Sequence, residues 1–139
     1  MFILDTNVVS ELRRPRKADP RVTAWASAHP VASFFLSSIT VLELELGVLT
    51  MERRDTAQGA VLRAWLDELV LPRFAGRIFA VDTAVALCCA RLHVPDPRAE
   101  RDALIAATAM VHGMTVVTRN TLDFAPTGVR ILNPWIDAR

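Results

Sequence analysis

The sequence contains little that would indicate a disulfide-bonded or strongly charged protein. Its two cysteines, Cys88 and Cys89, are adjacent in a helical pattern, so their side chains point in different directions and cannot easily form a disulfide. We interpret them as small buried residues of a protein in a reducing compartment. The 16 basic and 15 acidic residues give a formal net charge of +1, so bulk charge neither supports nor excludes a nucleic-acid ligand.

The sequence also shows neither the features of a signal peptide nor an uninterrupted membrane span. The N-terminus has no basic region and reaches an acid already at Asp5. The window 22–42 contains no Asp, Glu, Lys or Arg and is long enough to mimic a span, but His29 and Pro30 interrupt it. We expect a helix, a turn and a strand there, and hence a cytoplasmic protein with no membrane association.

What is present is the pattern of a single α/β domain. The 139 residues, of which 52% are hydrophobic, suit one domain over 1–139, and no repeat or linker divides them. Mostly apolar runs, typical of strands buried on both faces, alternate with segments of helical spacing, which predicts a parallel sheet covered by helices on both faces. The expected strands are 2–4, 33–36, 78–81, 115–118 and 129–132, and the expected helices are 8–13, 21–28, 39–51, a long one ended by Pro72, 83–93 and 99–112.

Two carboxylates stand out against their surroundings. Asp5 follows the first expected strand directly, and in open α/β sheets the carboxyl ends of strands are where sites form; an ordinary helix N-cap is the alternative interpretation. Asp102 lies on the same helical stripe as Ile105 and the alanines after it, where an unpaired charge is expensive. Its alternative is a buried salt bridge to Arg101 or Arg119.

Two further polar groups are ambiguous when taken alone. Glu43 lies in a helix that is apolar almost all round, and Thr40 with Glu43 also fits a capping box. Glu45 is the rival acid, on roughly the opposite side of that helix. The segment 118–124 follows an expected strand, as Asp5 does, but the Asp, Asn and Thr in it are also ordinary turn residues.

Several acids at one sheet edge would suit a divalent cation. Mg²⁺ and Mn²⁺ prefer oxygen ligands, and crowded carboxylates repel one another unless such an ion neutralises them. The sequence has no Walker loop, dinucleotide-binding turn, zinc-type Cys/His spacing or Ser-His-Asp order that would indicate a different chemistry. The three histidines are scattered, and we interpret them as structural.

Together these residues resemble the PIN-domain ribonucleases, and among them the VapC-like toxins of bacterial type II toxin–antitoxin pairs, with the FitB-type subgroup most similar. The resemblance runs from the first expected strand to the last and rests on several short motifs in order at suitable separations. It implies a PIN-like three-layer α/β/α fold with a central, mostly parallel sheet of four to five strands. The matching pieces are 3–7 (Ile-Leu-Asp-Thr-Asn), 38–44, 102–109, 117–120 and 131–135 (Ile-Leu-Asn-Pro-Trp).

The resemblance implies an acidic site of Asp5, Glu43 and Asp102. Asp5 and Asp102 would be the firmest ligands of Mg²⁺ or Mn²⁺, and Glu43 would complete the set or act through a bound water. Some members of the family have Asp where this chain has Asn120, whereas others have Asn there and Asp three residues later. Asp123 is therefore the candidate fourth acid, and Asn120 remains an alternative metal or water contact.

The same resemblance assigns roles to neighbouring side chains. Thr6 and Asn7 would orient the first carboxylate, and Thr118 would line the pocket. Arg119 and the basic loop 13–17 would position the phosphates of the substrate, although a solvated connection also explains that loop.

The implied activity is Mg²⁺-dependent endonucleolytic cleavage of RNA, in which metal-activated water attacks a phosphodiester. The implied partners are an RNA substrate, a second copy of the chain and an antitoxin protein that masks the site, with DNA reached only through that antitoxin. Two other interpretations stay open: a weakly active or non-enzymatic partner of a DNA-binding antitoxin, and a housekeeping RNA-processing nuclease with the same site.

Overall fold

The computed structural model describes residues 1–137 and has a five-stranded sheet at its centre. The strand order is β3-β2-β1-β4-β5, and each neighbouring pair is parallel. The predicted parallel sheet is thus confirmed, with shorter strands at its edges than the sequence indicated. The strands are β1 (Phe2–Leu4), β2 (Phe34–Ser37), β3 (Ile78–Phe79), β4 (Thr115–Val117) and β5 (Ile131–Leu132).

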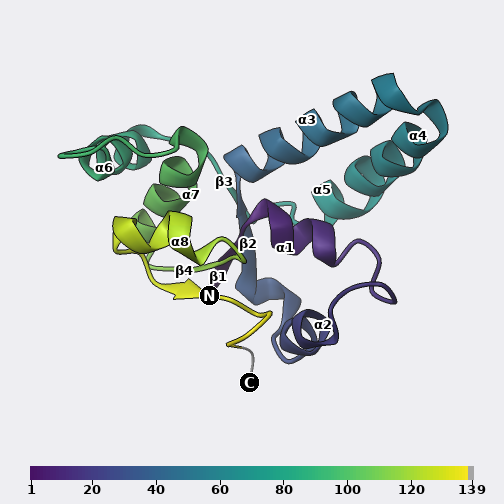
Figure 1. The fold of residues 1–139 in the computed structure, drawn as a ribbon, viewed down its shortest axis with the longest axis horizontal. Coiled ribbons are helices and arrows are strands. Elements are labelled where there is room, and N and C mark those ends of the chain that lie inside the picture. The colour runs from purple at the N-terminus through teal and green to yellow at the C-terminus, as the bar shows by residue number, and fades with distance from the viewer. Residues whose placement is uncertain (138–139) are drawn as a thin grey trace.

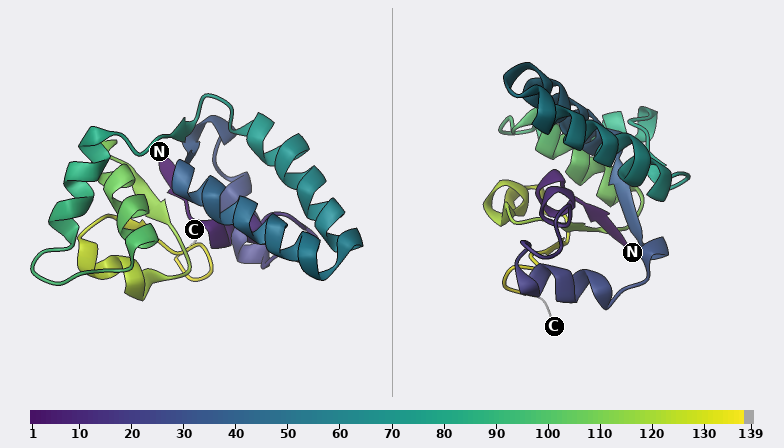
Figure 2. Two further views of the ribbon diagram at one scale, coloured as in Figure 1. Left: turned by 90° about the horizontal axis from the view of Figure 1, so that it is seen from above. Right: turned by 90° about the vertical axis from the view of Figure 1, so that its right-hand side faces the viewer.

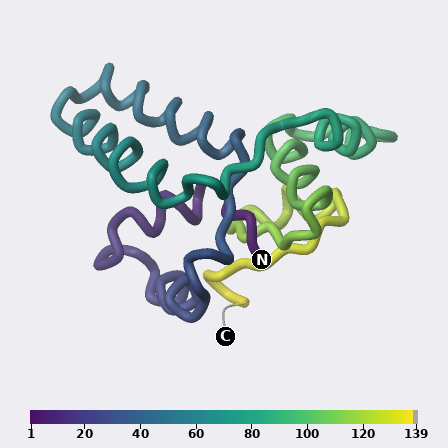
Figure 3. The backbone as a smooth tube through the Cα atoms, turned by 180° about the vertical axis from the view of Figure 1, so that it is seen from behind, coloured from purple at the N-terminus to yellow at the C-terminus, as the bar shows by residue number. Residues whose placement is uncertain are grey.

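Helices cover both faces of this sheet, as predicted. Figure 1 and the view from above in Figure 2 show the α3–α4 pair on one side of the strands and the α6–α7 pair on the other, and Figure 3 shows β3 linking the two sides. No helix within residues 1–137 is long and apolar enough to cross a bilayer. The helices are α1 (Thr6–Glu11), α2 (Pro20–Ser27), α3 (Ser38–Arg54), α4 (Thr56–Ala64), α5 (Leu71–Arg73), α6 (Thr83–Leu92), α7 (Glu100–Val111) and α8 (Thr121–Phe124), with short turns η1 (Val31–Ser33), η2 (Trp65–Val70) and η3 (Ala125–Thr127).

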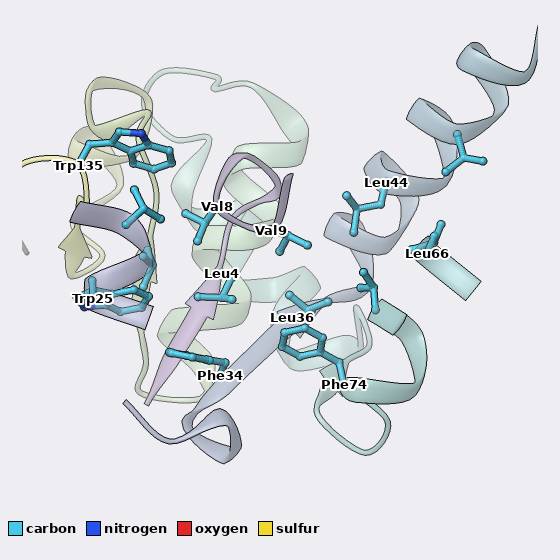
Figure 4. Close-up of a cluster of buried hydrophobic side chains, with 14 residues drawn as sticks. Leu4, Val8, Val9, Trp25, Phe34, Leu36, Leu44, Leu66, Phe74 and Trp135 are labelled. Carbon is cyan, nitrogen blue, oxygen red and sulfur yellow. The ribbon is translucent and has the colours of Figure 1, made fainter. Parts of the chain in front are cut away.

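The core lies on both faces of β1, because successive side chains of a strand point to opposite faces. Leu4 belongs to a cluster that includes Val8, Trp25 and Leu36, on the α1–α2 side, as Figure 4 shows. Ile3 belongs to a second cluster with α7 and β4. Both cysteines are buried and free, in a third cluster between α6 and α7, as expected.

Two local predictions were wrong. The segment after β4 was expected to be a polar turn, but it contains the short helix α8. The long helix was expected to end at Pro72, but it continues from α4 through the π-helical turn η2 into α5, which ends at Arg73. Pro72 is the second residue of α5 and follows the π-helical residues of η2 almost directly.

The parallel arrangement brings three chain segments to one edge of the sheet. Asp5 follows β1, Ser37 ends β2 and precedes α3, and Thr118 follows β4. Because β1 lies between β2 and β4, the segment at Asp5 is flanked by both of the others. The candidate site lies at this carboxyl edge.

A candidate acidic metal centre

Asp5 is both a helix cap and the most enclosed carboxylate of the site. It is 4% exposed, at the N-cap of α1, where its Oδ1 accepts a hydrogen bond from the backbone N–H of Thr6 at 2.8 Å. Its Oδ2 accepts from the hydroxyl of Thr118 at 2.7 Å. Asp5 can therefore cap α1 through Oδ1 and still belong to the candidate site through Oδ2.

Asn7 joins the loops that follow β1 and β4. Its Nδ2 donates to Asp5 Oδ2 and to Thr118 Oγ1, both at 3.3 Å. Its Oδ1 accepts from the backbone N–H of Arg119 at 3.3 Å, and the backbone N–H of Asn120 donates to Thr118 Oγ1 at 2.9 Å. Asp5, Asn7 and Thr118 thus form one hydrogen-bonded group, although Thr118 is 111 residues from Asn7 and 113 from Asp5 in the sequence.

Glu43 reaches the same edge from the second turn of α3. Its Oε1 accepts from the Thr6 hydroxyl at 2.7 Å, and its Oε2 lies 3.9 Å from a guanidinium nitrogen of Arg101. Thr6 therefore contacts two acids, Asp5 through its backbone N–H and Glu43 through its side chain. The role that the resemblance implies for Thr6, at the first carboxylate, thus extends to Glu43.

The alternative interpretation of Thr40 and Glu43 as a capping box is wrong. α3 begins three residues earlier than that pattern required, and its cap is Ser37, whose hydroxyl accepts from the N–H of Ile39 at 3.0 Å. The Thr40 hydroxyl is buried and has no hydrogen-bond partner among residues 1–137. Glu43 is thereby released from a capping role and is available to the site.

Glu45 is excluded as the site acid by its own partner. Both of its oxygens accept from the guanidinium of Arg63, at 2.6 and 2.8 Å, and Arg63 also contacts Glu52. These bonds tie α3 to α4 and lower the pKa of Glu45. The two-residue offset from Glu43 thus places the two acids in different surroundings.

Asp102 contributes the acid from the first turn of α7. Burial, followed by the negative charges of Asp5, Asp123 and Glu43, raises its pKa to about 6. The predicted alternative of a buried salt bridge is not observed, because no salt bridge within residues 1–137 involves Asp102 and Arg101 instead faces Glu43. The carboxylate is held among like charges rather than beside a cation.

Asp123 approaches the same point from α8. It is exposed, and its charge, with that of Glu43, raises the pKa of Asp5, although burial is the largest cause and the bonds from Thr118 and Thr6 oppose it. Asp123 also raises the pKa of Asp102. Asp5 and Asp102 thus each feel the charges of Glu43 and Asp123, while Asn120 meets this group through its backbone N–H, which donates to Thr118.

The donor set of this site fits a hard divalent cation. Carboxylate, amide and hydroxyl oxygens are the ligands that Mg²⁺ and Mn²⁺ prefer. Burial, and after it the neighbouring acids, raises the pKa values of Asp5 and Asp102, and a bound cation would favour the charged form of both carboxylates. Asp5, Asp102 and Glu43 would hold the ion. Because Mg²⁺ retains several waters, the carboxylates need not all contact it directly.

A second group, which sequence reasoning missed, has tighter spacing but unsuitable chemistry. Among residues 1–137, ligand atoms of Cys89, His93 and Glu100 lie within 4.8 Å of one another, and the i, i+4 spacing of the first two was a visible signal. However, His93 Nδ1 accepts from the N–H of Arg98, so the proton of a neutral ring sits on Nε2, which faces Glu100. Burial also raises the pKa of the Cys89 thiol, which disfavours the thiolate that a metal would need.

Comparisons with known proteins agree with this arrangement. A sequence model of the PIN domain matches residues 2–126. The chain is 40% identical over 142 residues to Toxin FitB of Neisseria gonorrhoeae, covering 99% of this chain and 100% of that protein. It is 38% identical over 143 residues to VapC ribonuclease Y4jK of Sinorhizobium fredii, covering 97% and 98%. Its backbone matches the crystal structure of FitAcB from Neisseria gonorrhoeae with a TM-score of 0.89 at 40% identity, covering 98% and 99%.

Proposed function

The chain belongs to the PIN-domain family, and from this premise we propose that it is a Mg²⁺-dependent endoribonuclease acting as the toxin of a toxin–antitoxin pair. The observation that carries the proposal is that Asp5, Glu43, Asp102 and Asp123 reach one edge of the sheet from four separate segments of the chain. Burial, and after it the neighbouring acids, raises the pKa values of Asp5 and Asp102 there. Relatives that are similar over nearly their whole length and named as a toxin and a ribonuclease support it.

In this proposal the residues of the chain hold an ion and orient the RNA. Asp5 and Asp102 bind the ion, and Glu43 completes the set or acts through a bound water. A bound Mg²⁺ or Mn²⁺ ion lowers the pKa of a coordinated water and stabilises negative charge on the phosphodiester in the transition state. Thr118 fixes the carboxylate plane of Asp5 through its hydroxyl bond.

The neighbouring polar residues complete this assignment. The Thr6 hydroxyl fixes Glu43, and Asp123 or Asn120 completes the site from the α8 side. Arg119 and the loop 13–17, where Arg14, Arg16 and Lys17 are exposed, contact phosphates of the RNA.

The test is cleavage of a fluorogenic RNA with Mg²⁺ and with a chelator. Asp5→Asn, Asp102→Asn and Glu43→Gln each remove a charge at the site, and we expect losses of about 100-fold or more in kcat. Glu45→Gln is the matched control, since it lies two residues from Glu43 but faces Arg63. Full activity in Asp5→Asn and Asp102→Asn would end the assignment. An inactive wild-type protein that still binds an antitoxin would favour the non-enzymatic alternative.

We further propose two protein partners, an antitoxin and a second copy of the chain. A mostly apolar groove of about 710 Å³ lies between α1–α2 and the η2–α5 region, lined in part by Leu12, Trp65 and Leu69. We propose that a segment of the antitoxin binds there and that DNA is reached only through the antitoxin. The exposed leucines of α3 are our candidate for contact with the second copy.

A further inference from the structure

The C-terminal motif Asn133-Pro134-Trp135 has no part in the acidic site described above, yet its backbone is tightly held. The side-chain Oδ1 of Asn133 accepts from the N–H of Trp135 at 2.9 Å, and the N–H of Asn133 donates to Asp137 at 3.0 Å. The N–H groups of Ile136 and Asp137 both donate to the Asn133 carbonyl. These bonds fix the turn that follows β5 and with it the direction of the Trp135 side chain.

This turn places an indole ring beside the candidate site. Trp135 is 5% exposed and packs in the cluster that contains Val8 and Trp25, as Figure 4 shows. The guanidinium carbon of Arg119 lies 5.2 Å from the centroid of the Trp135 ring. The backbone N–H of the same arginine donates to Asn7, which in turn bonds Asp5. The Asn7 side chain thus connects Asp5 to Arg119, and Arg119 in turn contacts the Trp135 ring.

The contact with the ring leaves the hydrogen-bonding capacity of Arg119 unused. A guanidinium over an aromatic face is held through its flat surface, and its N–H donors remain available at its edge. Within residues 1–137 no hydrogen bond or salt bridge of the Arg119 side chain is observed. Asp19 is close enough to feel the charge of Arg119, but both of its oxygens already accept from Arg21.

We propose that Trp135 is a positioning residue that holds the Arg119 guanidinium beside the acidic site as a contact for an RNA phosphate. The inference rests on the proposed nuclease function. An arginine already held in place loses less conformational freedom when it binds, and five donors in a fixed plane match phosphate oxygens. Trp135 itself touches no substrate, and it acts only through Arg119.

The test is a double-mutant cycle read by RNA binding in the presence of a chelator. The anisotropy of a labelled single-stranded RNA gives the Kd of the wild type, Arg119→Ala, Trp135→Leu and the double variant. We expect roughly tenfold weaker binding for Arg119→Ala and about threefold for Trp135→Leu. The double variant should bind no more weakly than Arg119→Ala, and Arg119→Ala should reduce the slope of log K against log salt by about 0.7, which is one phosphate contact on a single strand.

Conservative variants separate positioning from folding, because Trp135 is buried and its loss can also destabilise the protein. Trp135→Phe keeps a ring and should bind within about twofold of wild type. Arg119→Lys, at an exposed position, keeps the charge but loses the planar contact, so it should weaken binding as Trp135→Leu does. In cleavage assays both weakened variants should raise KM and leave kcat unchanged.

Two outcomes would overturn the proposal. One is unchanged binding and salt slope in Arg119→Ala and Arg119→Lys, whatever their thermal stability, since Arg119 would then merely cover the ring. The other is full additivity of the two losses in the double variant. Binding is measured without metal or turnover, so failure of this inference is distinguishable from failure of the nuclease assignment, which the acidic-site variants test separately.

Discussion

At the scale of a single residue, the charged Asp102 carboxylate lowers the stability of the folded protein at the candidate site. Burial and three neighbouring acids raise its pKa to about 6, from an ordinary value near 3.8. The folded protein then binds a proton at Asp102 more tightly than the unfolded chain does. In the absence of metal, its contribution to the free energy of unfolding therefore falls as the pH rises from about 4 to about 6, and stays low above that range.

Replacing this carboxylate should stabilise the metal-free protein at high pH. We expect Asp102→Asn to raise the free energy of unfolding by about 1 kcal/mol at pH 8, a value discounted for the partial exposure of the side chain, and by much less near pH 4. Urea unfolding with a chelator at both pH values measures this. Asp96→Asn, at an exposed loop acid, is the control and should change little at either pH. A loss of stability in Asp102→Asn at pH 8 would contradict the interpretation.

Candidate site residues could be selected from the sequence where they broke a local pattern. Asp5 ended an apolar strand, and Asp102 interrupted an apolar stripe, so both stood out without any knowledge of the fold. Glu43 did not, because Thr40 offered it a local partner, and the real partner, Thr6, lies 37 residues away. No helix rule contains a contact of that range, and Glu43 entered the predicted site through family resemblance alone.

At the scale of elements, a chemically distinct cap marked some helix ends but not others, since the start of α3 at Ser37 was missed in favour of Thr40. The expected starts and ends of α6 and α7 agree with their caps: Asp82 accepts from the N–H of Val85, and Gly113 follows α7 with a φ of +66°, a conformation that favours glycine. α8 was missed because its four residues are too few to display a helical repeat. The continuation through η2 into α5 was missed because proline was taken only as a helix terminator.

The close packing of α4 on α3 requires a glycine at position 59, because there is no room for a side chain there. A Cβ added to Gly59 would lie 2.5 Å from the Glu52 backbone Cα, whereas one added to Gly47, exposed on α3, would meet nothing within 4 Å. We expect Gly59→Ala to lower the free energy of unfolding by about 1–3 kcal/mol. Gly47→Ala, the matched control, should raise it by about 0.5–1 kcal/mol, because alanine is the better helix former. Denaturant unfolding compares the two, and equal effects would argue against close contact of the helices.

At the scale of the molecule, parallel strands and helices on both faces followed from the alternation of apolar runs and helical patterns. The strand order did not, since short strands give no pairing information beyond their burial. That order decides the site: β1 at the centre places Asp5 between the segment carrying Glu43, which follows β2, and the segment carrying Thr118, which follows β4. A chain with the same local pattern but β1 at an edge would leave Asp5 with a neighbour on one side only.

The assembly of the whole molecule depends on an apolar stripe that the single chain leaves uncovered. Leu42, Leu46 and Leu49 occupy one face of α3 and are 46%, 45% and 48% exposed, which is unusual for leucines at i, i+4 and i+7. We expect the wild type to be a dimer by light scattering and Leu46→Lys to shift it to the mass of one chain, because a buried lysine without a partner would weaken the contact strongly. Leu69→Lys, on the groove proposed for the antitoxin, should leave the dimer intact. A wild-type protein that stays monomeric at high concentration would remove the dimer from the proposal, and a dimer unaffected by Leu46→Lys would place its interface on another face.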